Sequence, residues 1–119
     1  MYEVELKFPV ADPRTLEQRL VSHGARLYPP VDQVDRYFNH PCRDFARTDE
    51  ALRLRHDGDG VAITWKGPRI DAATKTRREI ELPLAAGAAD DGAAAFPPAR
   101  TIADWTELLE ALGFRPVAT

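Results

Sequence analysis

The chain has 119 residues, 44% apolar and 29% charged, a composition typical of one soluble globular domain. Its formal net charge of −3 excludes the strongly basic surface of a general nucleic-acid binder, so any anion site must be built locally. No apolar run approaches the roughly 20 residues that cross a membrane, and the acidic N-terminus does not resemble a signal peptide. Because Cys42 is the only cysteine, an internal disulfide is excluded, and we expect a cytoplasmic location.

The first third of the chain predicts a strand, a helix and a second strand. Apolar and charged residues alternate strictly over residues 2–8, as in a strand with one apolar face. A helix over about 13–23 begins with an aspartate cap and a proline and ends at Gly24. Residues 33–39 then predict the second strand.

The middle of the chain predicts three further strands. Residues 51–56 alternate again, and the Asp-Gly-Asp-Gly sequence at 57–60 is typical of a hairpin turn. The turn leads into a strand over 61–66, which Gly67-Pro68 is expected to close. Residues 76–84 form the fifth strand, with apolar and charged residues on opposite sides.

The C-terminal third predicts a loop followed by an amphipathic helix. Residues 85–99 are rich in Ala, Gly, Asp and Pro, which indicates a loop or a weak helix. The sequence at 101–104 resembles a capping box, and Gly113 ends the helix that it would begin. The apolar residues of this helix recur at i, i+3, i+4 and i+7, namely Trp105, Leu108, Leu109 and Leu112.

Two short segments of the chain repeat one another. The Glu-Val-Glu-Leu sequence at 3–6 reappears as Glu-Ile-Glu-Leu at 79–82, each time in a strand that precedes a helix. Both helices end in Gly-X-Arg. This similarity predicts two related halves, of which the second reaches Thr119 before its next strand. We therefore expect one domain over 1–119 that is incomplete at its C-terminus.

Charged residues share one face of the predicted strands. For any single strand, a solvated polar face with weak ion pairs explains them. In combination they indicate more, because Glu3 and Glu5 lie two residues apart, about 6.6–6.8 Å, and such carboxylates favour a cation between them. Arg53 and Arg55 offer planar forks suited to phosphate oxygens. The predicted face carries Glu3, Glu5, Lys7, Arg53, Arg55, Thr64, Lys66, Arg77, Glu79 and Glu81.

The Glu3-x-Glu5-x-Lys7 sequence resembles the signature of the CYTH superfamily, which groups class IV adenylyl cyclases, thiamine triphosphatases and inorganic triphosphatases. Further matches follow in the same order and extend the resemblance over residues 3–84. They are Gln33-Val-Asp35-Arg-Tyr37-Phe38, Ala51-Leu-Arg53-Leu-Arg55, Thr64-Trp-Lys66-Gly67-Pro68 and Arg78-Glu79-Ile-Glu81.

The resemblance implies an α+β fold, in which a curved antiparallel sheet forms a partial or complete triphosphate-tunnel β-barrel with helices packed outside. It also implies a role for each residue on the charged face. Glu3 and Glu5 would bind Mg²⁺ or Mn²⁺, and Glu79 and Glu81 would orient the cations or join a metal site. The triphosphate would be held by Lys7, Arg53, Arg55 and Lys66, of which Lys7 and Lys66 are also expected to be catalytic. For Asp35 and Tyr37, a place inside the tunnel and a place at its rim both stay open.

Three functions follow from this resemblance. The first is metal-dependent hydrolysis of an inorganic or organic triphosphate, and the second is a class IV-type adenylyl cyclase that makes cyclic AMP from ATP. The third is a non-catalytic half-tunnel that binds polyphosphate or nucleotide. The expected partner is a triphosphate-containing small molecule, with no nucleic acid and no membrane. A homodimer that pairs two open sheet edges is the alternative route to a closed structure. We expect the chain alone to be weakly active or inactive, and to self-associate or expose apolar surface.

Overall fold

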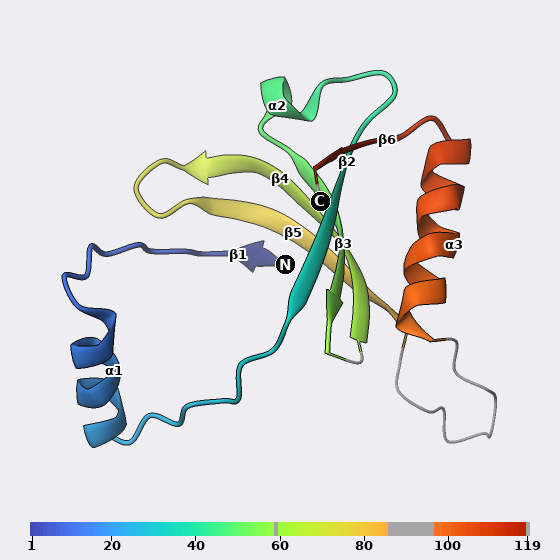
Figure 1. The fold of residues 1–119 in the computed structure, drawn as a ribbon. Coiled ribbons are helices and arrows are strands. Elements are labelled where there is room, and N and C mark those ends of the chain that lie inside the picture. The colour runs from blue at the N-terminus through green and yellow to red at the C-terminus, as the bar shows by residue number, and fades with distance from the viewer. Residues whose placement is uncertain (59, 86–96, 119) are drawn as a thin grey trace.

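The computed structural model of the chain describes residues 1–58, 60–85 and 97–118. Six strands form one curved antiparallel sheet in the order β1-β5-β4-β3-β2-β6, so that β1 and β6 are its edges among the described residues (Figure 1). This confirms the predicted α+β class with a curved, unclosed sheet. The elements are β1 (Tyr2–Glu3), α1 (Pro13–Ser22), β2 (Gln33–Asn39), α2 (Phe45–Thr48), β3 (Ala51–Asp57), β4 (Gly60–Asp71), β5 (Thr76–Ala85), α3 (Pro98–Ala111) and β6 (Arg115–Ala118).

Strand β4 continues past the point where the sequence predicted its end. Asp57 pairs with Gly60 across the predicted hairpin turn, in which Gly58 has a φ of +61°. The expected stop at Gly67-Pro68 is wrong, because the register with β5 shifts between Lys66 and Arg69. Such an irregularity removes proline from the hydrogen-bond ladder, and the strand then runs on to Asp71.

Strand β1 is shorter than the predicted strand over 2–8. It pairs with β5 through Tyr2 and Arg78 and through Glu3 and Arg77. Residues opposite the rest of the segment lie in the turn before β5, where Lys75 has a φ of +47°. Beyond Glu3, the backbone bond from Glu5 N–H to the carbonyl of Thr74, at 3.1 Å, extends the contact. The strand ends because its partner turns away.

The two longer helices start at prolines. Asp12 caps α1 as predicted, since its side chain accepts a hydrogen bond from the Arg14 backbone N–H. The capping box predicted at 101–104 is wrong: α3 begins at Pro98, one turn earlier, and no side chain caps it. Proline already has the φ that the first helical turn needs and has no N–H that a cap would have to satisfy. Of the loop or weak helix predicted over 85–99, residues 86–96 lie outside the described residues.

The repeated segments occupy equivalent places in the fold. β1 pairs with β5, and β2, which follows α1, pairs with β6, which follows α3. Both helices end in the same motif: Gly24 and Gly113 have φ values of +94° and +96°, and the next N–H bonds the carbonyl five residues back. The pairings and the helix ends fit the predicted relation between the halves, which itself stays a prediction. Strand β6 corrects the expectation that the chain ends before the next strand.

The apolar core lies between one face of the sheet and α3. Leu54 is completely buried, and Phe38, Phe45, Leu52 and Leu109 pack around it, with Trp65, Trp105 and Phe114 at the margin. Because side chains alternate along a strand, burial of Leu52 and Leu54 places Arg53 and Arg55 on the opposite face of β3. That opposite face is called the polar face below.

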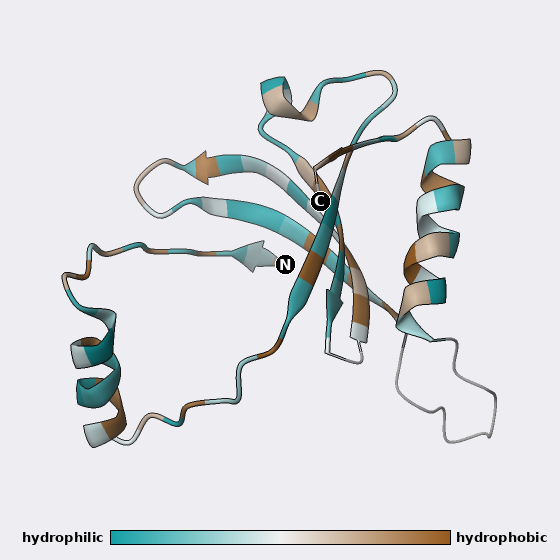
Figure 2. Cartoon of the chain, viewed as in Figure 1, coloured by the Kyte–Doolittle hydropathy of each residue, from teal (hydrophilic) through white to brown (hydrophobic). Residues whose placement is uncertain are grey.

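Helix α1 stands apart from the sheet. Figure 2 shows hydrophobic stretches on both sides of α1, and Leu16 and Leu20 of the helix itself are exposed. Val4, Leu6 and Phe8, which precede the helix, are exposed as well. The expected self-association stays a prediction. It would occur through these side chains and through the edge strands β1 and β6. None of the described helices has the length and apolarity needed to cross a membrane.

Candidate functional site

Three neighbouring strands bring Arg53, Thr64 and Glu81 into one row on the polar face. Thr64 is the register partner of both Arg53 on β3 and Glu81 on β5. The Thr64 hydroxyl donates to Glu81 Oε1 at 3.1 Å and accepts a long bond from Arg53 Nη2 at 3.5 Å. Arg53 and Glu81 themselves approach only to 4.0 Å. The row therefore holds the Arg53 guanidinium in place, but it gives the hydrogen-bond donors of that group only long contacts.

Arg53 is the most deeply buried cation of the polar face. Only 8% of the residue is exposed, and its Nε–H is the one buried side-chain polar group among the described residues without a hydrogen-bond partner. An unpaired buried donor of this kind is costly, and a charged one more so. An anion that reached the guanidinium would supply the missing acceptor.

Arg55 is held by a carboxylate that the sequence left unassigned. Its Nε and Nη2 donate to the two oxygens of Asp35 at 2.7 and 2.8 Å, a bidentate pair across β2 and β3. The hydrogen bond from Arg55 lowers the pKa of Asp35 below its usual value and raises that of Arg55. Asp35 thus faces the same side as the predicted phosphate-binding residues and orients one of them.

Replacing Asp35 with asparagine should lower the free energy of unfolding by about 1 kcal/mol at neutral pH, because a partly buried bidentate pair is lost. The lowered pKa of Asp35 means that this contribution is present above the unfolded value of about 3.9 and disappears as the pH falls through the folded value. Urea unfolding of both proteins at about pH 7 and about pH 2.5 measures it. A difference that does not shrink in acid would contradict the ion pair.

Lys66 connects two carboxylates at the next row. Its ammonium donates to Glu3 Oε2 at 2.7 Å and lies 3.9 Å from Glu79 Oε2. The hydrogen bond from Lys66 lowers the pKa of Glu3, whereas burial and then the charge of Glu3 raise the pKa of Glu79. Glu3 and Glu79 therefore form an interacting carboxylate pair with one ammonium beside it.

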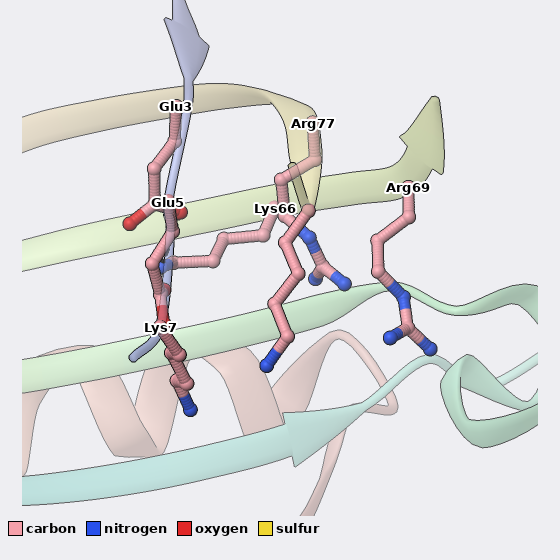
Figure 3. A pocket seen from close by; sticks show the side chains of 7 residues that line it. Glu3, Glu5, Lys7, Lys66, Arg69 and Arg77 are labelled. Carbon is pink, nitrogen blue, oxygen red and sulfur yellow. Dashed lines mark hydrogen bonds and ion pairs between the residues drawn. The ribbon is translucent and has the colours of Figure 1, made fainter. Parts of the chain in front are cut away.

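A cavity of about 190 Å³ opens at the end of the polar face where β1 meets the β4–β5 hairpin. Figure 3 shows Glu3 and Glu5 close to Lys66, with the guanidinium groups of Arg69 and Arg77 pointing to the same side. Glu5 contacts Lys7 at 3.5 Å. The lining residues are Glu3, Glu5, Lys7, Lys66, Arg69, Lys75 and Arg77.

The structure thus divides the predicted site residues into two neighbouring groups. Glu3, Glu5, Lys7 and Lys66 line the cavity. Arg53, Arg55 and Glu81 lie farther along the sheet on the same face, and Glu79 lies 3.9 Å from Lys66 of the first group.

Two cavity residues were not predicted as site residues, Arg69 and Lys75. Both follow Gly67-Pro68, where the sequence predicted that β4 ends, so no face could be assigned to them. The sequence assigns Arg77 to the charged face, because it lies two residues from Glu79, but gives it no role in the site. Asp49 was missed as well: it binds Arg69 and Arg77 from the turn after α2.

The oxygen donors of this region suit a hard divalent cation. Glu3 and Glu79 place two carboxylates together, and Mg²⁺ is usually bound by one or two carboxylates with substrate phosphates and water. The described residues contain no cluster of three or more metal-binding side chains. Glu3 and Glu5, the predicted metal ligands, line the same cavity, and Glu79 is a further carboxylate that interacts with Glu3. Phosphate oxygens would complete the coordination.

Comparisons with known proteins show which family the chain resembles. A family model described as "CYTH domain" matches residues 1–119. A Methanocaldococcus jannaschii protein named "Putative adenylate cyclase MJ0240" is 42% identical over 84 residues, which are 71% of this chain and 48% of that protein. The solved structure of the PH1819 protein from Pyrococcus horikoshii OT3 is 40% identical with a TM-score of 0.53, covering 72% of this chain and 43% of that one. The chain spans about half the length of the curated relative that it matches.

Proposed function

Because the chain belongs to the CYTH domain family, we propose that its polar face binds a triphosphate chain and takes part in metal-dependent hydrolysis of that triphosphate. Members of the family generally bind triphosphates and use divalent metal ions. Hydrolysis would transfer the terminal phosphoryl group to water and release the remaining diphosphate. We also propose that the protein is located in the cytoplasm.

The observation that carries this proposal is the state of Arg53. Its guanidinium is buried, its Nε–H has no partner among the described residues, and its contacts with Thr64 and Glu81 are long. Arg55 lies two residues from Arg53 along β3, and Lys66 lies two residues from Thr64 along β4, so both are on the same face. A phosphate chain supplies several acceptor oxygens in a line, which is what this arrangement of donors lacks.

Each side chain has a distinct part in the proposed reaction. Arg53 and Arg55 hold phosphate oxygens, while Lys7 and Lys66 offset charge that develops on the transferred group. Glu3 and Glu79, with Glu5 at the same cavity, would hold Mg²⁺ or Mn²⁺. When bound, the metal would neutralise charge on the phosphate oxygens. Asp35 orients Arg55, and Thr64 orients Arg53.

The name of the M. jannaschii relative favours a second candidate, an adenylate cyclase activity. The same residues would then hold ATP, and the ribose 3′-hydroxyl would attack the α-phosphate and release diphosphate. Metal and cation sites are shared by both candidates, so the products separate them. Incubation with ATP and Mn²⁺ should give phosphate for a hydrolase and cyclic AMP with diphosphate for a cyclase, and tripolyphosphate is a substrate only of the hydrolase.

Binding of the metal is testable apart from turnover. With tripolyphosphate present, Mg²⁺ at about ten times its dissociation constant should raise the melting temperature by about 5 °C, because a ligand that binds only the folded chain stabilises it. Glu79→Gln should remove most of this shift. Glu107→Gln, an exposed position of α3, is the matched control and should keep it. Equal shifts in Glu79→Gln and wild type would exclude Glu79 from the metal site.

A further inference from the structure

The cavity at the β4–β5 hairpin has more positive charge than its carboxylates balance. Five of its seven lining residues are cations, and Glu3 is already bound by Lys66 at 2.7 Å. Glu5 has Lys7 at 3.5 Å. Both carboxylates that face the cavity are therefore engaged, and three more cations, Arg69, Lys75 and Arg77, remain.

Asp49 fixes two of these cations from outside the cavity. Its Oδ2 accepts from the backbone N–H and the Nε–H of Arg69, both at 3.0 Å, and its Oδ1 accepts from Arg77 Nη2 at 3.3 Å. One carboxylate thus orients two guanidinium groups that are register partners on β4 and β5. Each guanidinium uses one N–H for Asp49 and has four left for another acceptor.

Lys75 adds a like charge next to Lys7. It lies in the turn before β5 with a φ of +47°, a conformation that lysine rarely adopts. Lys7 and Lys75 line the same cavity. Two ammonium groups at one cavity repel each other, and an anion between them removes the repulsion.

The cations of the polar face also form a line. Arg55, Arg53, Lys66 and the Arg69–Arg77 pair occupy successive rows of the β3–β4–β5 sheet, in the order of their register. Along β5 the row of Arg77 is four residues from the row of Glu81 and Arg53, or about 13 Å. A single phosphate at Arg53 cannot reach the hairpin, whereas a chain of several phosphates can.

We propose that Arg69, Lys75 and Arg77 form a terminal subsite for linear polyphosphates longer than triphosphate, with Asp49 as the residue that positions its two arginines. The inference rests on the proposed function, since it extends the same phosphate-binding face. Arg53 and Lys66 would hold the part of the chain common to all lengths. The hairpin subsite would contact only the additional phosphates.

Titration calorimetry with diphosphate, tripolyphosphate and a linear polyphosphate of about ten units, at fixed Mg²⁺, tests the inference on the whole chain. We expect Lys75→Asn, which removes the charge and tolerates the positive φ, to weaken the long polyphosphate about five- to tenfold and tripolyphosphate less than twofold. Arg69→Gln should do the same. Arg100→Gln on α3, beyond the opposite face, should change neither. Asp49→Asn should also weaken binding of the long polyphosphate, and it should change the affinity for diphosphate less.

The outcomes separate this inference from the proposed function. If tripolyphosphate and the long chain lose affinity equally in Lys75→Asn and Arg69→Gln, or lose none, the hairpin subsite is wrong while the triphosphate site stands. If no phosphate chain binds the wild-type protein, the proposed function fails as well. A thermal melt of each variant without ligand distinguishes lost contacts from lost folding.

Discussion

Replacing Arg53 with lysine is expected to weaken tripolyphosphate binding by about ten- to a hundredfold. Hydrogen bonds to charged groups are worth about 1.5–3 kcal/mol, and each 1.4 kcal/mol is a factor of ten in affinity. Lysine keeps the charge but loses the planar fork and the Nε–H that has no partner in the folded chain. The loss should appear in calorimetric titration with tripolyphosphate.

Arg36→Lys is the matched control for this experiment. Arg36 lies on the adjacent strand β2, but its side chain is on the opposite face and donates to Thr106 of α3 at 2.9 Å. It should change stability slightly and leave tripolyphosphate affinity as in the wild type. If Arg53→Lys also binds as well as the wild type, Arg53 only supports the sheet, and the observation that carries the proposed function loses its meaning.

Leu54→Ala should lower the free energy of unfolding by about 3 kcal/mol, a large effect for a single substitution. Leu54 is 0% exposed and lies at the centre of the core beneath α3. Truncating such a leucine removes its transfer free energy and leaves a cavity that the surroundings fill only in part. Urea denaturation of the purified chain measures the loss.

Leu82→Ala provides the control at the same row of the sheet, because Leu54, Ile63 and Leu82 are in register across β3, β4 and β5. Leu82 is 55% exposed, so its truncation should cost about 1 kcal/mol or less. Similar losses at Leu54 and Leu82 would mean that α3 covers a different part of the sheet.

The sequence alone determined most of the strands and the side on which each charge lies. Strict alternation along 51–56 and 76–84 is enough to assign Arg53, Arg55, Glu79 and Glu81 to one face, because the period of a strand admits only two sides. Gly24 and Gly113 marked two helix ends, since each needs a positive φ that other residues avoid. The order of the charged motifs also indicated the family.

Local patterns misjudged the places where a neighbouring strand decides the outcome. Strand β1 stops at Glu3 because β5 turns away at Lys75, and β4 passes Pro68 because the register shifts there. Neither event is encoded in the alternation of the strand itself. As a result Arg69 and Lys75, which follow Pro68, had no predicted face and were missed.

Only the tertiary structure decided which charges meet. Glu3 was expected to act with Glu5, two residues away, and Glu79 from the neighbouring strand β5 is a further carboxylate that interacts with it, while Lys66 bonds it from β4. Asp49, in a turn with no periodic signal, orients Arg69 and Arg77. Sequence periodicity fixes the side of a sheet on which a residue lies, whereas register between strands fixes its neighbours. Binding and catalysis depend on those neighbours, because Coulomb and hydrogen-bond energies fall off within a few ångströms.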